Sequence, residues 1–492
     1  MLTVPGRTET IRNRHVAAGA LIFGVTAALL LVCAQQAGAQ ELGPLRGEAA
    51  GQAAAEAVTV DDAAETDAGE ETVATALPAP DFEDMPGRAR AVEPVAPVQG
   101  TGGVPEDDPF APAGIRFGSF ILRPSAEIGV AGSRETTGSA SAVDRVLGDT
   151  ALRLDLESDW DRHAVTVTAD GRMQKPLNGG ESEPELSVTA TGRLDITDGT
   201  TLTGSLGYAY ALDDPQSAAY LAATDPALVP AVTGTNDPAV QVFDGSVALR
   251  QEFGALFGET ELSAERAIYG DAKLSDGMTV SQHDLDNTLY DARLRAGIEV
   301  SPVLSPFVEV SWGLRRMDTA PDSGGIDRNA TRYGLRGGAA IDFGEKLNGE
   351  IAAGYIKEDI ADAALTDLAG VAVDAALNWS PRRGTDLALT LATTTETGGS
   401  AGDSGALLYS ADLGVTHEAR ADLTLEAGFG TEYRDEQGGA DELTLSGSAA
   451  LTYWFNRFTG LTTRIGHERT TSSDPASRSE TTTAFVGLKL QR

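Results

Sequence analysis

Apolar and polar side chains alternate with a period of two between Phe117 and Val130. One face of this stretch is apolar, and its members are Phe120, Leu122, Pro124, Ala126, Ile128 and Val130. The other face carries Arg123, Ser125, Glu127 and Gly129. Because successive side chains of a β-strand point to opposite sides of the sheet, the pattern predicts a strand with one apolar and one hydrated face.

The same two-sided pattern recurs up to the C-terminus, in segments of about 10–14 residues. Clear examples are 152–160, 186–196, 290–299, 371–379 and 443–455. In the third of these, Tyr290 and Leu294 oppose Arg293. Each segment fits period two better than the helical period of 3.6, and no run after the N-terminal region is long and apolar enough for a membrane-spanning helix.

Short and long connections alternate between these segments. Short turns are expected near 161–162, 198–199, 255–256, 302–303, 345–346, 382–383, 419–420 and 456–457. Longer polar loops are expected at 131–149, 173–184, 213–239, 270–287, 317–329, 359–367, 396–405, 434–440 and 470–479. Short turns at one end and long loops at the other are typical of outer-membrane barrels. We therefore predict an all-β fold, a transmembrane antiparallel up-and-down β-barrel of about 18 strands, over residues 114–492.

Aromatic residues near the two kinds of connection support this fold. Beside the short turns stand Trp160, Phe253, Phe307, Phe343, Trp379, Phe455 and Phe458. Beside the long loops stand Tyr210, Tyr269, Tyr290, Tyr333, Tyr355, Tyr409 and Tyr433. Lipid-exposed barrels carry aromatic girdles at both interfaces, although aromatic residues also flank turns in other sheets.

The N-terminal quarter of the chain has a different character. Residues 1–39 resemble a secretory signal peptide, with three arginines, an apolar stretch and a small-residue cleavage site before Gln40. An uncleaved membrane anchor is the alternative. Residues 40–113 are rich in Ala and Pro, and between Gln40 and Phe110 they carry 16 acidic and only 3 basic side chains. We expect this segment to be disordered, either as a solvated tail or as a tether.

Composition excludes several function classes. The 492 residues carry a formal net charge of −36, which argues against a nucleic-acid partner. The single cysteine, Cys33, lies within the expected signal peptide, so the mature chain has no disulfide or thiolate site. The five histidines are scattered without metal-binding spacing. We therefore expect no enzyme activity, no catalytic or metal-binding residues and no cofactor.

The hydrated face carries the informative chemistry. A charged base facing lipid at the centre of a membrane costs about 2–4 kcal/mol, so period two favours an inward position for these side chains. The candidate lumen-lining residues are Arg123, Glu127, Arg153, Asp155, Glu157, Arg193, Asp195, Arg250, Arg295, Glu299, Arg315, Arg336, Asp374, Asp412 and Glu426. The inward set contains more acids than bases, which favours cations, unless the charges pair across strands and merely fill the lumen.

The segment Arg116–Val130 carries a resemblance to a known family. Its opening Gly118-Ser119-Phe120-Ile121-Leu122-Arg123-Pro124-Ser125, which follows an acidic leader, resembles the alphaproteobacterial putative β-barrel porin family of the second type. The resemblance covers roughly residues 115–492. It implies an outer-membrane location and a pore, and it implies no defined substrate.

Together these observations predict an outer-membrane, porin-like channel for passive diffusion of small hydrophilic solutes. The expected partners are the Gram-negative outer-membrane bilayer, the barrel-assembly machinery and small hydrophilic solutes, with further copies of the chain as one option. One alternative is a non-conducting barrel with a role in surface structure or polysaccharide export. Another is a soluble secreted β-sandwich or solenoid, which the continuous apolar face disfavours.

Overall fold

The computed structural model describes residues 109–138, 141–212, 238–273, 279–398, 403–437, 439–473 and 475–492. The strands are β1 (Ile115–Phe117), β2 (Phe120–Thr137), β3 (Val143–Ser158), β4 (Ala164–Pro176), β5 (Glu183–Thr197), β6 (Thr200–Leu212), β7 (Ala239–Phe253), β8 (Leu256–Tyr269), β9 (Ala272–Lys273), β10 (Thr279–Val280), β11 (Asn287–Ile298), β12 (Leu304–Met317), β13 (Ala330–Asp342), β14 (Leu347–Ile360), β15 (Leu368–Arg382), β16 (Thr385–Glu396), β17 (Ala406–Arg420), β18 (Leu423–Glu436), β19 (Glu442–Asn456), β20 (Thr459–Ser472) and β21 (Ser479–Gln491). Three short 3₁₀ helices, η1 (His283–Leu285), η2 (Gly344–Lys346) and η3 (Pro475–Ser477), lie in the connections.

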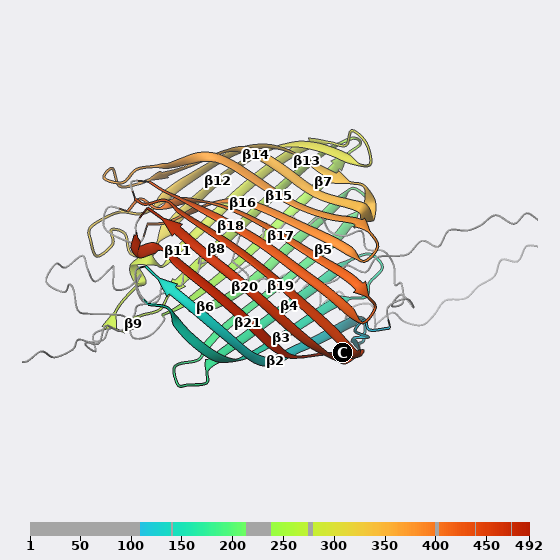
Figure 1. Ribbon diagram of the computed structural model, residues 1–492. Coiled ribbons are helices and arrows are strands. Elements are labelled where there is room, and N and C mark those ends of the chain that lie inside the picture. The colour runs from blue at the N-terminus through green and yellow to red at the C-terminus, as the bar shows by residue number, and fades with distance from the viewer. Residues whose placement is uncertain are drawn as a thin grey trace, which may run out of the picture.

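Eighteen strands, β2–β8 and β11–β21, form one closed antiparallel sheet. Each strand pairs with its neighbours in the chain, and β8 pairs with β11 across the connection that holds the small β9–β10 hairpin. Closure comes from β2 and β21, whose register runs from Ser125↔Gln491 to Thr137↔Ser479. Figure 1 shows the tilted strands from the side, with the first and last strands next to each other. The predicted antiparallel up-and-down barrel of about 18 strands is confirmed.

The connections divide into the two predicted sets. All eight predicted short turns lie at the junction of two consecutive strands, for example between β5 and β6 and between β15 and β16. The largest difference is the expected loop 131–149, because β2 continues to Thr137 and β3 already begins at Val143. Its polar residues stay in the ladder, since Arg145 lies 3.8 Å from Glu135 and 3.5 Å from Glu183. Charge that pairs across strands is compatible with a strand, so polarity alone was a poor sign of a loop.

The outer face forms an apolar belt. Large exposed side chains include Ile128, Leu152, Leu294, Val308, Leu335, Val371 and Phe429, which alternate with polar or small inner residues. Most of the predicted aromatic girdle residues are exposed as well, for example Phe253, Trp379 and Tyr355. Phe307 is a correction, because it is only 5% exposed and lies on the inner face beneath Arg295.

Three inward aromatic rings explain how the barrel wall stays closely packed near the short-turn end. The Phe257 ring lies where a Cβ on Gly297 would be, and Phe307 lies in the same way against Gly338. The Phe485 ring covers Gly487 of its own strand. Since a glycine has no side chain, the inward ring can lie flat on the neighbouring backbone without displacing it.

Some expectations concern residues outside the described ranges. These are the signal peptide 1–39, nearly all of the acidic segment 40–113, and most of the loop 213–239. Within the part of the chain that the structure describes, no helix is long and apolar enough to cross a membrane.

The aromatic–glycine contacts give a test of barrel packing. We expect Gly297→Val to destabilise the folded barrel by about 1–3 kcal/mol, because its side chain would overlap the Phe257 ring. The matched control is Gly258→Val, since a Cβ at Gly258 meets no atom within 4 Å. The measurement is the urea dependence of heat-modifiable gel mobility after refolding. Adding Phe257→Ala to Gly297→Val should recover part of the loss, and equal midpoints for the two glycine variants would contradict the packing argument.

Candidate functional site

The inner face of β2–β5 carries a ladder of ion pairs. Arg123 lies 2.8 Å from Glu157, and Arg193 lies 2.9 Å from Asp195. Arg153 contacts both Asp155, at 3.0 Å, and Asp170, at 3.3 Å. These side chains are between about one-fifth and one-half exposed, so they remain accessible to water.

A tighter cluster lies where the barrel closes. Glu127 of β2 accepts hydrogen bonds or ion pairs from Arg464 of β20 at 2.9 Å and from Lys489 of β21 at 3.1 Å. Arg464 also stands 5.3 Å from the centre of the Phe485 ring. One buried carboxylate thus joins three strands, including the two that close the sheet.

The most buried charges form a mid-barrel network on β8 and β11–β15. Arg295 contacts Glu309 at 2.8 Å and Glu350 at 2.7 Å, and Arg336 contacts Asp374 at 2.7 Å. Arg293 adds contacts to Glu261 and Glu309. Arg336 and Glu309 are each 2% exposed, so this part of the inner face is packed rather than solvated. Such desolvated charges are tolerated because each has partners of the opposite sign.

Aromatic rings extend this network toward the short-turn end. The guanidinium of Arg295 lies 4.0 Å from the centre of the Phe307 ring, and that of Arg250 lies 3.9 Å from the Phe257 ring. Arg250 also contacts Glu299 at 3.2 Å. Cation–π contact adds to the ion pairs and keeps the guanidinium groups flat against the wall.

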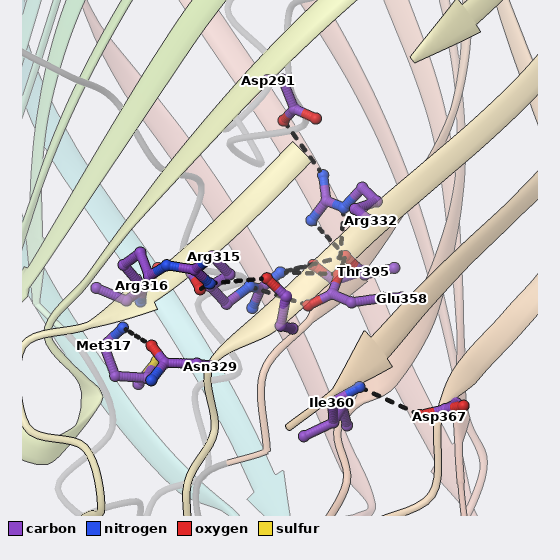
Figure 2. Close-up of polar contacts among 12 residues, drawn as sticks. Asp291, Arg315, Arg316, Met317, Asn329, Arg332, Glu358, Ile360, Asp367 and Thr395 are labelled. Atoms are coloured by element: carbon purple, nitrogen blue, oxygen red, sulfur yellow. Dashed lines mark hydrogen bonds and ion pairs between the residues drawn. The ribbon is translucent and has the colours of Figure 1, made fainter. Parts of the chain in front are cut away.

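A second network lies nearer the long-loop end, and Figure 2 shows its members. Arg315 and Arg332 each contact Glu358 at 3.1 Å, and Arg332 also reaches Asp291 at 3.7 Å. The Thr395 hydroxyl group lies at its centre, bonded to Arg332 and Glu358 and 3.2 Å from an Arg315 nitrogen. These residues come from five different strands, β11 to β14 and β16.

Thr395 reaches this network because the upper part of β16 leaves the barrel wall. Backbone pairing between β15 and β16 runs only from Arg382↔Thr385 to Ala375↔Leu391, whereas β16 and β17 stay paired up to Glu396↔Ala406. We call residues 393–396 and 406–409 the folded-in hairpin. Its outer face covers the inner face of β14 and β15, where Leu407 packs in one buried cluster with Ile356 and Ala372.

Side chains replace the missing backbone ladder at this seam. The Thr393 hydroxyl group donates to the Val373 carbonyl at 3.0 Å and accepts from the Val373 N–H at 2.9 Å. A Cβ at Gly370 would lie 2.6 Å from Leu407, so the glycine leaves room for the folded-in hairpin. The polar groups of the β15 edge are thus partly satisfied by threonine rather than by a strand.

The loops above the hairpin are connected to one another. Arg328 donates to the Asp403 carbonyl at 2.7 Å, and the Thr366 N–H donates to the Ser404 hydroxyl at 2.8 Å. The Asp362 carboxylate accepts from the backbone N–H groups of Ala364 and Asp327, which holds its pKa below the usual value. These contacts join the β12–β13, β14–β15 and β16–β17 connections around the hairpin.

The inner face of β16–β20 carries several acidic side chains. Glu432 of β18 lies close to Glu396, Glu468 and Asp412, with Arg434 as a nearby base. Arg434 itself contacts Glu396 at 2.9 Å. Glu426 stands on the same face of β18 as Glu432. We call Glu396, Asp412, Glu426, Glu432 and Glu468 the acidic wall.

The fifteen candidate residues therefore fall into separate groups. Seven belong to the β2–β5 ladder and the closure cluster, six to the networks of β7 and β11–β15 and their short-turn extension, and two, Asp412 and Glu426, to the acidic wall. Their role as the lining of a conducting lumen stays a prediction.

Several residues of these networks were not among the fifteen predicted lumen-lining residues, and two of them, Glu261 and Thr395, differ in the signal that the sequence carried. Glu261 had a clear signal, because Glu259, Ser263 and Glu265 share its parity on β8. Thr395 had none, since Leu387, Leu389 and Leu391 would place it on the lipid side.

Within the described ranges, no group of three or more His, Cys, Asp or Glu side chains could hold a metal ion. What the inner face provides is fixed charge of both signs along the barrel axis.

Comparison with solved structures finds distant likenesses. These include OpdQ of Pseudomonas aeruginosa (10% identity, 75% of this chain and 98% of that one, TM-score 0.34) and OccK2 (OpdF) of the same species (12%, 75% and 98%, 0.36). A BenF-like porin from Pseudomonas fluorescens Pf-5 matches at 10% identity over 75% and 99% of the two chains, with a TM-score of 0.37. No curated protein matches the chain.

The family comparison is decisive where those likenesses are too distant to carry an argument. The family model described as Putative beta-barrel porin 2 matches residues 108–492, which is the whole barrel. The chain belongs to the putative β-barrel porin 2 family and is an outer-membrane β-barrel protein of the porin kind.

Proposed function

We propose that this protein is a passive, porin-like channel that lets small hydrophilic solutes cross the Gram-negative outer membrane through a charged lumen. The observation that carries the proposal is the closed sheet of 18 strands with an apolar exterior and a charged interior. Barrels of 16–18 strands leave an aqueous channel. The fifteen candidate residues, from Arg123 to Glu426, line that channel.

The proposal includes the surroundings of the barrel. The apolar belt is embedded in the outer-membrane bilayer, with the short turns in the periplasm and the long loops outside. The barrel-assembly machinery inserts the chain, and copies of it associate in the membrane. The acidic segment before the barrel acts as a solvated leader after removal of residues 1–39.

One observation favours a second candidate, the non-conducting barrel. The mid-barrel network is desolvated, with Arg336 and Glu309 each only 2% exposed. A lumen filled by such pairs would serve surface structure or polysaccharide export better than free diffusion. Against this, the β2–β5 ladder is more exposed, with the Arg123 and Glu157 side chains 31% and 52% exposed, which supports a hydrated path beside the packed network.

Single-channel recording separates the two candidates. We expect refolded protein to insert into planar bilayers and give discrete, ohmic current steps, because no energy input gates a passive pore. The control is the same preparation after boiling in detergent, which loses its heat-modifiable gel mobility. Folded protein that inserts into vesicles and gives no current steps would instead favour the non-conducting barrel.

The acidic wall predicts the sign of ion selectivity. Two unit charges about 8 Å apart in water interact by about 0.5 kcal/mol, so each exposed carboxylate changes the local cation concentration about twofold. We expect K⁺ to be preferred over Cl⁻, and we expect Asp412→Asn with Glu426→Gln to lower that preference. The measurement is the reversal potential in a salt gradient.

A matched control tests whether position rather than net charge matters. Asp198→Asn with Glu345→Gln removes two carboxylates from exposed short turns. Both positions are distant in the sequence from the residues of the acidic wall. Selectivity should stay at the wild-type value in this variant. An equal shift in both double variants would show that the acidic wall has no special role.

A further inference from the structure

We propose that the folded-in hairpin of β16 and β17 sets the size limit of the pore, with Thr395 as the residue that positions it. The inference rests on the proposed channel function and goes beyond it by assigning the constriction to a segment of the barrel wall itself. The hairpin consists of strand residues that remain paired with each other and with β18 while they lie inside the ring that the other strands define.

Two layers of the sheet overlap at the level of the folded-in hairpin. Thr395 and Leu407 share the face of their strands that carries lipid-facing leucines lower down, such as Leu391 and Leu413. At the level of the hairpin the same face is buried, with Leu407 1% exposed, against the inward residues Ile356 and Ala372. An outer face can meet an inner face only where one part of the sheet lies inside another.

The overlap of the two layers takes up space in the lumen. Barrel diameter grows roughly linearly with strand number, so a ring in which two strands are folded in has about four-fifths of the open area. The hairpin itself also occupies part of that area. The long-loop end of the barrel is therefore its narrow end, and the edge of the hairpin facing the lumen carries Glu396, which Arg434 holds at 2.9 Å.

Contacts of one threonine with buried charged side chains hold the hairpin in its folded-in position. The Thr395 hydroxyl group is bonded to Arg332 and Glu358 and lies 3.2 Å from Arg315, three side chains that are themselves buried. Valine at this position would keep the shape and remove every one of these side-chain bonds. Because a buried donor or acceptor without a partner is costly, the loss would favour release of the hairpin.

The hairpin also has a second position open to it, in which β16 continues its ladder with β15. The register Ala375↔Leu391 continues upward as 373 opposite 393 and 371 opposite 395. Thr393 already lies next to Val373 and bonds to its backbone through the hydroxyl group. In the continued ladder Leu407 and Tyr409 would face lipid, which suits an apolar side chain and an interfacial aromatic residue.

Paired cysteines distinguish the two positions, in a chain that also carries Cys33→Ser. Ala372→Cys with Leu407→Cys joins side chains that touch when the hairpin is folded in. Val371→Cys with Thr395→Cys joins positions that face each other only in the continued ladder. We expect the first pair to oxidise readily in refolded protein, and the second to oxidise when Gly370→Leu fills the space that Leu407 occupies.

Conductance then reports the effect on the pore. Oxidation of the first pair should leave the current at the wild-type value, and oxidation of the second should raise it by about 1.3-fold, in line with the area that two returned strands add. Thr395→Val should give the larger current for part of the time and admit larger polyethylene glycols than wild type. Thr395→Ser, which keeps the hydroxyl group, is the matched control and should behave as wild type.

The outcomes separate this inference from the channel proposal. If wild-type protein conducts but Thr395→Val and both oxidised pairs share its conductance and polymer limit, the hairpin does not set the size limit. If the second pair never forms, even with Gly370→Leu, the hairpin has no second position and the inference is wrong. If no variant conducts, the channel proposal fails, and the size limit assigned to the hairpin fails with it.

Discussion

The structure depends on one constraint, which is that a sheet surrounded by lipid must satisfy its backbone hydrogen bonds internally. Closure of β2 on β21 meets this constraint for the ring as a whole. The constraint also explains why polar segments such as the end of β2 remain strands, since their backbone groups need partners whatever their side chains are. Between β15 and β16 the ladder stops above Ala375 and Leu391, and side chains such as Thr393 take over there for the same reason.

Charge follows from closure in a second way. Once the outer face is committed to lipid, every ionised residue within the belt has to lie inside, and the inside of a barrel is crowded where neighbouring strands all contribute charges. On β11–β15 this crowding leads to mutual pairing around Glu309 and Glu358. On β17–β20 the residues between the carboxylates are small, as with Gly430 and Ser446, so the acidic wall stays more open.

The fold could be predicted from sequence because two solvents act on alternate residues. Period two, the eight short turns and the strand number all follow from the need for lipid on one face and water on the other. Inner pairings could not be predicted in this way. Arg295 meets Glu350, which lies 55 residues along the chain, and only the stagger of the two intervening strands, β12 and β13, brings them together. Phe307 shows a related limit, because its position beside a short turn suggested the lipid interface, whereas its ring lies on the inner face beneath Arg295.

Thr395 marks the point where period two stops being a guide to environment. Its parity assigns it to lipid, and threonine is tolerated there, but the structure gives it three charged partners on the inside. A leucine would have fitted the lipid position better and the buried charges worse. Threonine is thus compatible with both faces of the barrel wall. Leu407 and Tyr409 are compatible with both faces as well, because each can lie against lipid or against the buried apolar cluster. A segment whose residues suit two environments is not fixed to one by hydrophobicity, so its position depends on a few hydrogen bonds, and those centre on a single hydroxyl group.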